Sequence, residues 1–248
     1  KLRWKNAYAL LTPNITRRLK MFDLEQPIQV KCDIAGNMGP GGNPHISVMA
    51  TVRENVLKTP KGEVENCNFD GYYTNNLFRD RGYSDANSTV RLINFKGINE
   101  KIPFYIDTAA INNFERPVAT GVFNADFEVS KLNEVIGNDL LKFTQGRVKM
   151  KLAYKADLVE LQINKPFVQG SVVINDAAFS YVPRNLNFKN TSIILKFTDK
   201  DLFINNLRLQ SGKSVVNMEG TVKNFLNLYY TDPQKIVLNW DIKSPQLH

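Results

Sequence analysis

Apolar and polar residues alternate with a period of two along most of the chain. Between residues 147 and 158 the apolar positions are Val148, Met150, Leu152, Tyr154, Ala156 and Leu158. Residues 235–243 repeat the pattern with Ile236, Leu238, Trp240 and Ile242. Successive side chains of a β-strand point to opposite faces, so each run predicts a strand with one apolar and one polar face.

Further runs of the same kind raise the expected number of strands to about eleven. They are Pro27–Ala35, Ile46–Val52, Thr89–Phe95, Pro103–Ala110, Val122–Val129, Ser171–Tyr181, Ser192–Thr198, Asp201–Leu209 and Ser214–Val222. A flat open sheet does not readily accommodate so many amphipathic strands. We therefore expect a mainly β fold, in which a long, twisted antiparallel sheet curls into a half-barrel or trough.

Turn residues and a few helical segments separate the runs. Gly36–Gly42 contains four glycines and a proline and predicts a loop, and Thr198–Asp201 predicts a hairpin turn. Thr12 and Pro13 precede an apolar stripe that predicts a short helix over about 13–22. A second short helix is expected over about 130–137, and residues 224–230 could add a third.

A weak internal similarity suggests two units. Gly62-Glu63-Val64 is followed by Phe69, and Gly170-Ser171-Val172 is followed by Phe179. The two segments align if the register is allowed to shift by one residue. The similarity is compatible with two stacked β units, residues 1–145 and residues 146–248 of one continuous sheet. It is also compatible with chance.

Composition narrows the class of protein only a little. The net charge of +8 would suit an anionic partner, but the charges are spread along the strands, as on a solvated face. The two cysteines, Cys32 and Cys67, are too few for a disulfide framework or a metal site. A single disulfide between them stays an alternative. No stretch approaches the ~18 apolar residues that a membrane-spanning helix needs.

Catalytic and metal-binding patterns are missing from the sequence. The only histidines are His45 and His248, and no known nucleophile, phosphate or zinc motif occurs, so we expect no enzyme activity, metal or cofactor. Asp199 and Asp201 are better explained by the hairpin than by calcium. The most polar loop is Arg79–Asp85, where Asp80 and Asp85 leave open a carbohydrate-active or carbohydrate-binding role.

Nucleic-acid binding by a sheet requires aromatic and basic residues on one face. Phe123, Phe127, Tyr154 and Trp240 instead fall on the apolar side of their strands. We therefore expect no nucleic-acid partner.

Several short phrases carry a family resemblance. They are Pro27-Ile28-Gln29-Val30, Gly62-Glu63-Val64, Phe69-Asp70-Gly71, Val129-Ser130-Lys131-Leu132-Asn133, Leu207-Arg208-Leu209, Ser211-Gly212-Lys213-Ser214, Met218-Glu219-Gly220 and Ser244-Pro245-Gln246-Leu247. Together with the rhythm of strands over nearly the whole chain, they make it resemble AsmA-like proteins of the Bacteroidetes type, relatives of the TamB envelope proteins.

The resemblance implies a periplasmic envelope protein anchored in the inner membrane by an N-terminal helix that this piece would lack. It also implies a part in outer-membrane biogenesis or in phospholipid transport between membranes along a hydrophobic β-groove, and it supplies no catalytic residue. The chain departs from larger relatives in its length, which is too short to span a periplasm alone.

The alternating pattern agrees with a groove but does not require one. An acyl-chain groove would be lined by Val148, Met150, Leu152, Tyr154, Ile236, Leu238, Trp240 and Ile242. Burial stabilises an apolar strand face whether side chains or lipid cover it, so an ordinary packed core fits equally well. A structural or interaction module that uses a sheet edge is a further alternative.

Overall fold

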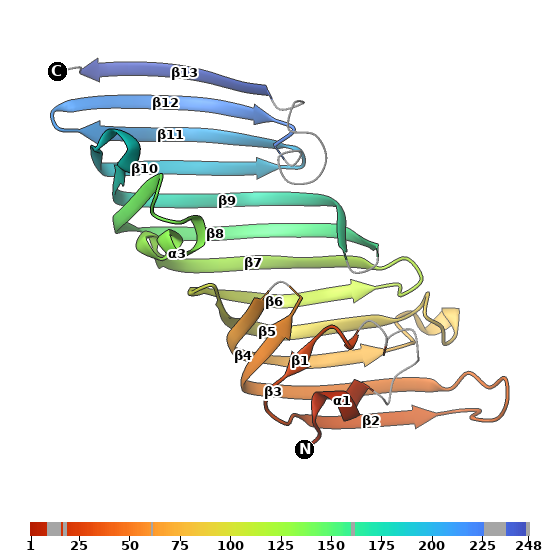
Figure 1. Ribbon diagram of the computed structural model, residues 1–248. Helices are drawn as coiled ribbons and strands as arrows, with labels where there is room; N and C mark the ends of the chain where they lie inside the picture. The colour runs from red at the N-terminus through yellow and green to blue at the C-terminus, as the bar shows by residue number, and fades with distance from the viewer. Residues whose placement is uncertain (9–15, 17–18, 61, 160–161, 226–236, 247–248) are drawn as a thin grey trace. The chain divides into compact units, whose positions relative to one another are not determined.

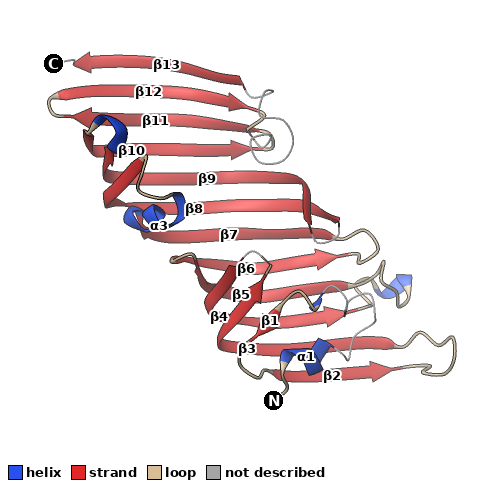
Figure 2. Ribbon diagram, viewed as in Figure 1, coloured by secondary structure: helices blue, strands red, loops and turns tan. Residues whose placement is uncertain are grey.

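The computed structural model describes residues 1–8, 16, 19–60, 62–159, 162–225 and 237–246 (Figure 1). The chain is 69% strand and 9% helical, and its strands form one open antiparallel sheet. The prediction of a mainly β protein with a few short helices is confirmed (Figure 2).

Thirteen strands are present in the described part of the chain. They are β1 (Asp23–Leu24), β2 (Gln29–Ala35), β3 (His45–Thr59), β4 (Gly62–Thr74), β5 (Thr89–Asn99), β6 (Ile102–Asn112), β7 (Val118–Glu128), β8 (Leu141–Val159), β9 (Gln162–Tyr181), β10 (Leu186–Thr198), β11 (Asp201–Ser211), β12 (Ser214–Lys223) and β13 (Val237–Gln246). From β3 to β13 each strand pairs with its neighbours in sequence, while β1 and β2 both pair with β3.

Each of the eleven predicted strands is found, but β1 and β4 were not among those eleven. In β4 the buried apolar residues are Val64, Cys67, Phe69 and Tyr73, so the alternation is broken between the first two. The break lies at Asn66, which has a φ of 52° and is an extra residue in the pairing with β3. Such a bulge hides a strand from a search for strict alternation.

Five other strands carry a bulge of the same kind. In each, a residue with a positive φ lies where the register of the pairing shifts by one. The residues are Glu54 in β3, Asn94 in β5, Asp176 in β9, Asn190 in β10 and Asn206 in β11. Four of the six bulge residues, counting Asn66, are asparagines, which tolerate the left-handed region better than most residues. The bulged strands thus form two consecutive groups, β3–β5 and β9–β11.

The described helices are short. They are α1 (Trp4–Tyr8), α3 (Leu132–Ile136) and the 3-10 turns η1 (Arg79–Arg81), η2 (Val129–Lys131) and η3 (Val182–Arg184). The helix expected over 130–137 corresponds to η2 and α3. Residues 13–15 and 17–18 of the helix expected over 13–22, and residues 226–230 of the third, lie outside the described residues. The predicted loop and hairpin are both present, with Thr198 paired to Asp201.

Two compact units make up the chain. Unit 1 comprises Lys1–Asn99, Phe104–Val122 and Lys155–Lys165, and unit 2 comprises Glu100–Pro103, Phe123–Tyr154 and Pro166–His248. In unit 1, Val48 and Tyr73 pack with Leu19, Val30 and Phe114. In unit 2 the core consists of Ala125, Phe127, Val129, Val148, Val172 and Ala177. The predicted boundary at residue 145 and the stacking of repeats stay predictions.

Candidate functional site

Two rows of paired residues form the apolar face of unit 1. Cys32, Val48, Tyr73 and Val90 make one row across β2, β3, β4 and β5, and Val30, Ala50, Gly71 and Leu92 make the next. Directly paired residues project to the same face of a sheet, so the two rows lie side by side on one surface.

The second row leaves a gap in this surface. Ala50 and Gly71 are paired between the larger Val30 and Leu92, so the middle of the row has almost no side-chain volume. A half-open hollow of about 210 Å³ lies here, and none of its lining residues is charged. Its walls include Ile28, Val30, Val48, Leu57, Phe69, Tyr73, Val90, Leu92 and Ile111. The hollow follows from small residues placed opposite one another on two strands.

The N-terminal segment borders the hollow with further hydrocarbon. Trp4 and Tyr8 of α1, together with Leu19 and Phe22, belong to its lining. The indole Nε1 of Trp4 donates a hydrogen bond of 3.2 Å to the carbonyl oxygen of Leu19. Leu2 and Ile28 exchange two backbone hydrogen bonds of 2.8 Å each. These bonds hold α1 against the rim of the hollow.

A buried amide fixes the chain that leads into this rim. Asn55 is 2% exposed, and its Nδ2 donates to the carbonyl oxygen of Gln26 at 2.9 Å. Its Oδ1 accepts from the backbone N–H groups of Gln26 at 3.0 Å and Val56 at 2.9 Å. Asn55 follows the Glu54 bulge, which turns it toward the interior. No sequence motif marked it, because an isolated asparagine in a strand carries no signal of burial.

The electrostatic character of the hollow is that of hydrocarbon. Burial raises the pKa of the Tyr73 phenol, because the interior disfavours the charged form. Nearby, burial raises the pKa of the Cys67 thiol to about 12. Cys32 and Cys67 are both free thiols. A surface of this kind has no group for acid–base chemistry near neutral pH, and it can accept an apolar ligand.

The groove residues expected from the sequence belong to unit 2 and are not part of the hollow of unit 1. Val148 is 1% exposed within the core, and Met150 and Leu152 pack against that core. Tyr154 is half-buried, and burial raises the pKa of its phenol. Val148 is therefore enclosed by side chains rather than open to a ligand.

The remaining predicted residues belong to β13, which four strands separate from β8. Leu238, Trp240 and Ile242 are 51%, 40% and 59% exposed. They continue the apolar face of unit 2, because Trp240 pairs with Gly220 and Gly220 pairs with Ile204. Ile236 lies outside the described residues.

The polar loop Arg79–Asp85 is organised by a residue that the sequence did not indicate. Asn87 is 3% exposed, and its amide donates to the carbonyl oxygens of Phe78 at 2.8 Å and Gly82 at 2.6 Å. Its Oδ1 accepts from the backbone N–H of Phe78 at 2.9 Å. The guanidinium of Arg81 stacks 4.5 Å from the centre of the Phe78 ring. These contacts account for the composition of the loop without a ligand.

No set of three or more potential ligand side chains is placed to hold a metal ion within the described ranges. None of the helices in those ranges has the length and apolar character needed to cross a membrane. Comparison with protein-family models, with curated proteins and with solved structures gave no match.

Proposed function

We propose that this chain is a non-enzymatic envelope protein that binds an acyl chain of a phospholipid in the apolar hollow of unit 1. The observation that carries the proposal is an uncharged hollow lined by aliphatic and aromatic side chains and bordered by α1. Water in such a site has few hydrogen-bond partners, so a hydrocarbon chain replaces it favourably.

The size of the hollow suits part of one lipid tail. Its volume of about 210 Å³ exceeds the roughly 150 Å³ at which an apolar protein cavity binds benzene. A segment of six methylenes would gain about 5 kcal/mol on burial, before the cost of association. The rest of the lipid would lie outside, which fits a protein that passes lipids on rather than storing them.

The cellular setting of the proposal rests on the resemblance to AsmA-like proteins. The resemblance implies a periplasmic location and a part in outer-membrane biogenesis or phospholipid transport, and we adopt both as parts of the proposal. The one-sided apolar strands of each unit support this setting, because an apolar strand face can pack against a lipid tail.

A photoreactive lipid tests the proposal directly. The purified chain is incubated with a phosphatidylethanolamine that carries a diazirine in one acyl chain, irradiated, digested and analysed by mass spectrometry. We expect labelled peptides from β3–β5 and α1, and competition by unlabelled phospholipid. Labelling that resists competition, or that avoids these segments, would overturn the proposal.

A second candidate is an interaction module that uses β13. This strand ends the order of the sheet in the described chain, and it exposes Leu238, Trp240 and Ile242. A free strand edge with an apolar face can accept a further strand from a partner. Cross-linking of β13 to a co-purified protein, with no lipid in the unit 1 hollow, would favour this function.

A further inference from the structure

The polar face of β10–β13 is hollowed in unit 2. Two adjacent depressions of about 270 Å³ and about 420 Å³ both include Glu219 and Asp241 in their linings, so they form one shallow groove. We call it the polar groove. Besides these two carboxylates, the side chains used below are Phe203, Asn205, Arg208, Asn217, Asn239 and Lys243.

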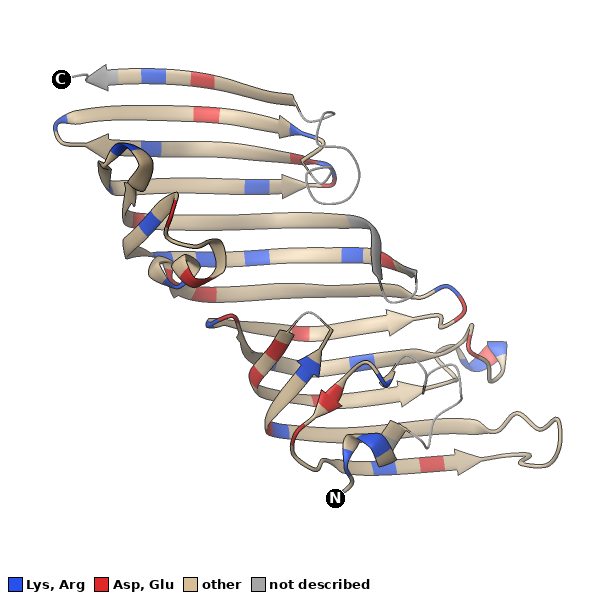
Figure 3. Cartoon of the chain, in the orientation of Figure 1, with Lys and Arg blue, Asp and Glu red and all other residues tan. Residues whose placement is uncertain are grey.

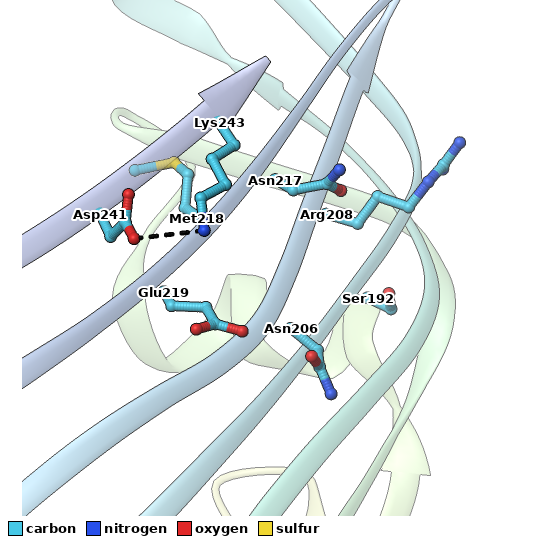
Figure 4. A pocket seen from close by; sticks show the side chains of 8 residues that line it. All are labelled: Ser192, Asn206, Arg208, Asn217, Met218, Glu219, Asp241 and Lys243. Carbon is cyan, nitrogen blue, oxygen red and sulfur yellow. Dashed lines mark ion pairs between the residues drawn. The ribbon is translucent and has the colours of Figure 1, made fainter. Parts of the chain in front are cut away.

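Strand pairing explains why these residues meet. Arg208 pairs with Asn217 and Asn217 with Lys243, while Glu219 pairs with Asp241. Paired residues share a face, so the rows from β11, β12 and β13 project to the same side. Figure 4 shows the Asp241–Lys243 ion pair at one side of the first depression, Arg208 at the other with Asn217 between them, and Glu219 below the ion pair.

The charges that line the polar groove balance. Arg208 and Lys243 face Glu219 and Asp241, and Lys243 Nζ lies 3.4 Å from an oxygen of Asp241. Arg208 already donates to the carbonyl oxygen of Asn190 at 3.1 Å. Along the whole chain the charged residues stand singly or in small groups on the strands (Figure 3). A balanced site of this kind disfavours polyanions, which require an excess of cations.

Several polar side chains of the groove lack a bonding partner among the described residues. Asn205, Asn217, Asn239 and Glu219 make no side-chain hydrogen bond or ion pair with another described residue. A carboxamide both donates and accepts hydrogen bonds, as a hydroxyl group does. Three amides and a carboxylate that face one groove therefore match a ligand with many hydroxyl groups.

An aromatic ring lies among these polar groups. Phe203 pairs with Thr221, which pairs with Asn239, and so it projects to the polar face. Its ring is only partly buried, and Lys223 Nζ lies 6.0 Å from the ring centre. The negative face of an aromatic ring attracts C–H groups that carry partial positive charge. The C–H faces of a pyranose ring are of this type.

Unit 1 contains a similar depression, of about 360 Å³, on its own polar face. Arg53 and Asp70 form an ion pair of 2.7 Å there, and Tyr105 is 39% exposed beside Asn94. Asn94 is the bulge residue of β5, as Asn206 is of β11, and each belongs to the lining of its own depression. The same classes of side chain thus recur at a bulge in both units.

We propose that the polar groove of unit 2 binds a neutral oligosaccharide. The amides of Asn205, Asn217 and Asn239 and the carboxylate of Glu219 hydrogen-bond its hydroxyl groups, and Phe203 stacks on one sugar ring. The site is on the opposite side of the strands from the apolar face, and the inference does not depend on lipid binding. It also differs from the Arg79–Asp85 loop, whose contacts are internal.

The test uses the whole chain and a panel of maltohexaose, cellohexaose and chitohexaose, with heparin as a polyanionic comparison. Isothermal titration calorimetry is expected to show binding of at least one neutral hexasaccharide. Glu219→Ala and Phe203→Ala are each expected to weaken that binding about tenfold or more, because each removes a direct contact. Asn239→Ala, at an exposed position, gives a third variant that leaves folding intact.

Matched controls come from the same unit. Glu134→Ala removes an exposed carboxylate from α3, and Phe167→Ala removes a 37% exposed ring from β9, so both should leave the affinity unchanged. Circular dichroism confirms that each variant is folded. Binding of heparin alone, no binding of any neutral hexasaccharide, or equal losses in the control variants would overturn the inference.

Discussion

Ala50 of β3 and Gly71 of β4 are directly paired, and a Cβ atom on Gly71 would lie 3.6 Å from the Cβ of Ala50. This distance is an ordinary van der Waals contact, so the backbone does not require glycine at this position on steric grounds. The pair instead leaves space, and that space is the hollow. Its volume can therefore be changed without altering the strands that enclose it.

Filling the hollow should abolish its use as a lipid site. Ala50→Leu places a larger side chain in the gap, and we expect the affinity for a pyrene-labelled fatty acid to fall about tenfold or more. Ala35→Leu makes the same change at an exposed position of β2 and should leave the affinity unaltered. Fluorescence titration measures both, and equal affinities would place the ligand elsewhere.

The two tryptophans distinguish the hollow from the β13 edge. Trp240→Phe leaves Trp4, at the hollow, as the only tryptophan, and Trp4→Phe leaves Trp240. A fatty acid with a spin label on its tail should quench the fluorescence of Trp4 in a saturable way, because the tail enters beside it. Quenching restricted to Trp240 would instead assign the apolar ligand to β13.

Asn87 should be a main determinant of the stability of the η1 loop. Asn87→Ala leaves the Phe78 N–H and the Phe78 and Gly82 carbonyl groups without their partner, and we expect a loss of about 2–4 kcal/mol in the free energy of unfolding. Asn138→Ala, at an exposed position, should change it by less than about 0.5 kcal/mol. Urea denaturation measures both, and a negligible effect of Asn87→Ala would show that the loop is held by other contacts.

Two glycines with positive φ should respond differently to alanine. A Cβ on Gly170 (φ 140°) would lie 2.0 Å from the carbonyl oxygen of Lys151, so the backbone of β8 or β9 would have to move. We expect Gly170→Ala to cost more than about 3 kcal/mol. Gly212→Ala (φ 58°) meets no atom within 4 Å and should cost about 1 kcal/mol from the backbone conformation alone. Equal costs in guanidinium denaturation would contradict the packing of Gly170.

The Cys67 thiol should make stability depend on alkaline pH. Burial raises its pKa from 9.0 to about 12, so the unfolded chain loses this proton more readily than the folded chain does. The contribution of the buried thiol to the free energy of unfolding is full below pH 9 and falls as the pH rises toward 12. The difference in unfolding free energy between the natural chain and Cys67→Ala should therefore shrink over this interval. A difference that is constant with pH would contradict the burial of the thiol.

Eleven of the thirteen strands were predictable because each contains a run of alternating residues, which is a local pattern. The hollow was not predictable because it depends on pairing between strands. The alternation at Arg147–Leu158 marks β8 from its own residues alone. Ala50 and Gly71, by contrast, are 21 positions apart, and their contact depends on the register of β3 and β4, in which the bulges at Glu54 and Asn66 lie on opposite strands and offset each other. No single segment contains that information.

The predicted groove residues show the same limit. Alternation indicated correctly that Val148 and Trp240 lie on apolar strand faces, but it could not tell an enclosed position from an open one. Val148 belongs to β8, which lies between β7 and β9, and is 1% exposed. Trp240 belongs to β13, the last strand in the order of the sheet, and is 40% exposed. Exposure depends on the place of a strand in the sheet, which its own sequence does not encode.

The bulges also have a genetic consequence. A strand that loses one residue within a regular stretch turns every later side chain to the wrong face. Loss of Asn66 or Asn206 is different, because the bulge already sets two residues opposite one, and its removal restores a regular ladder. Among descendants of this chain, single-codon deletions should therefore accumulate at the left-handed asparagines.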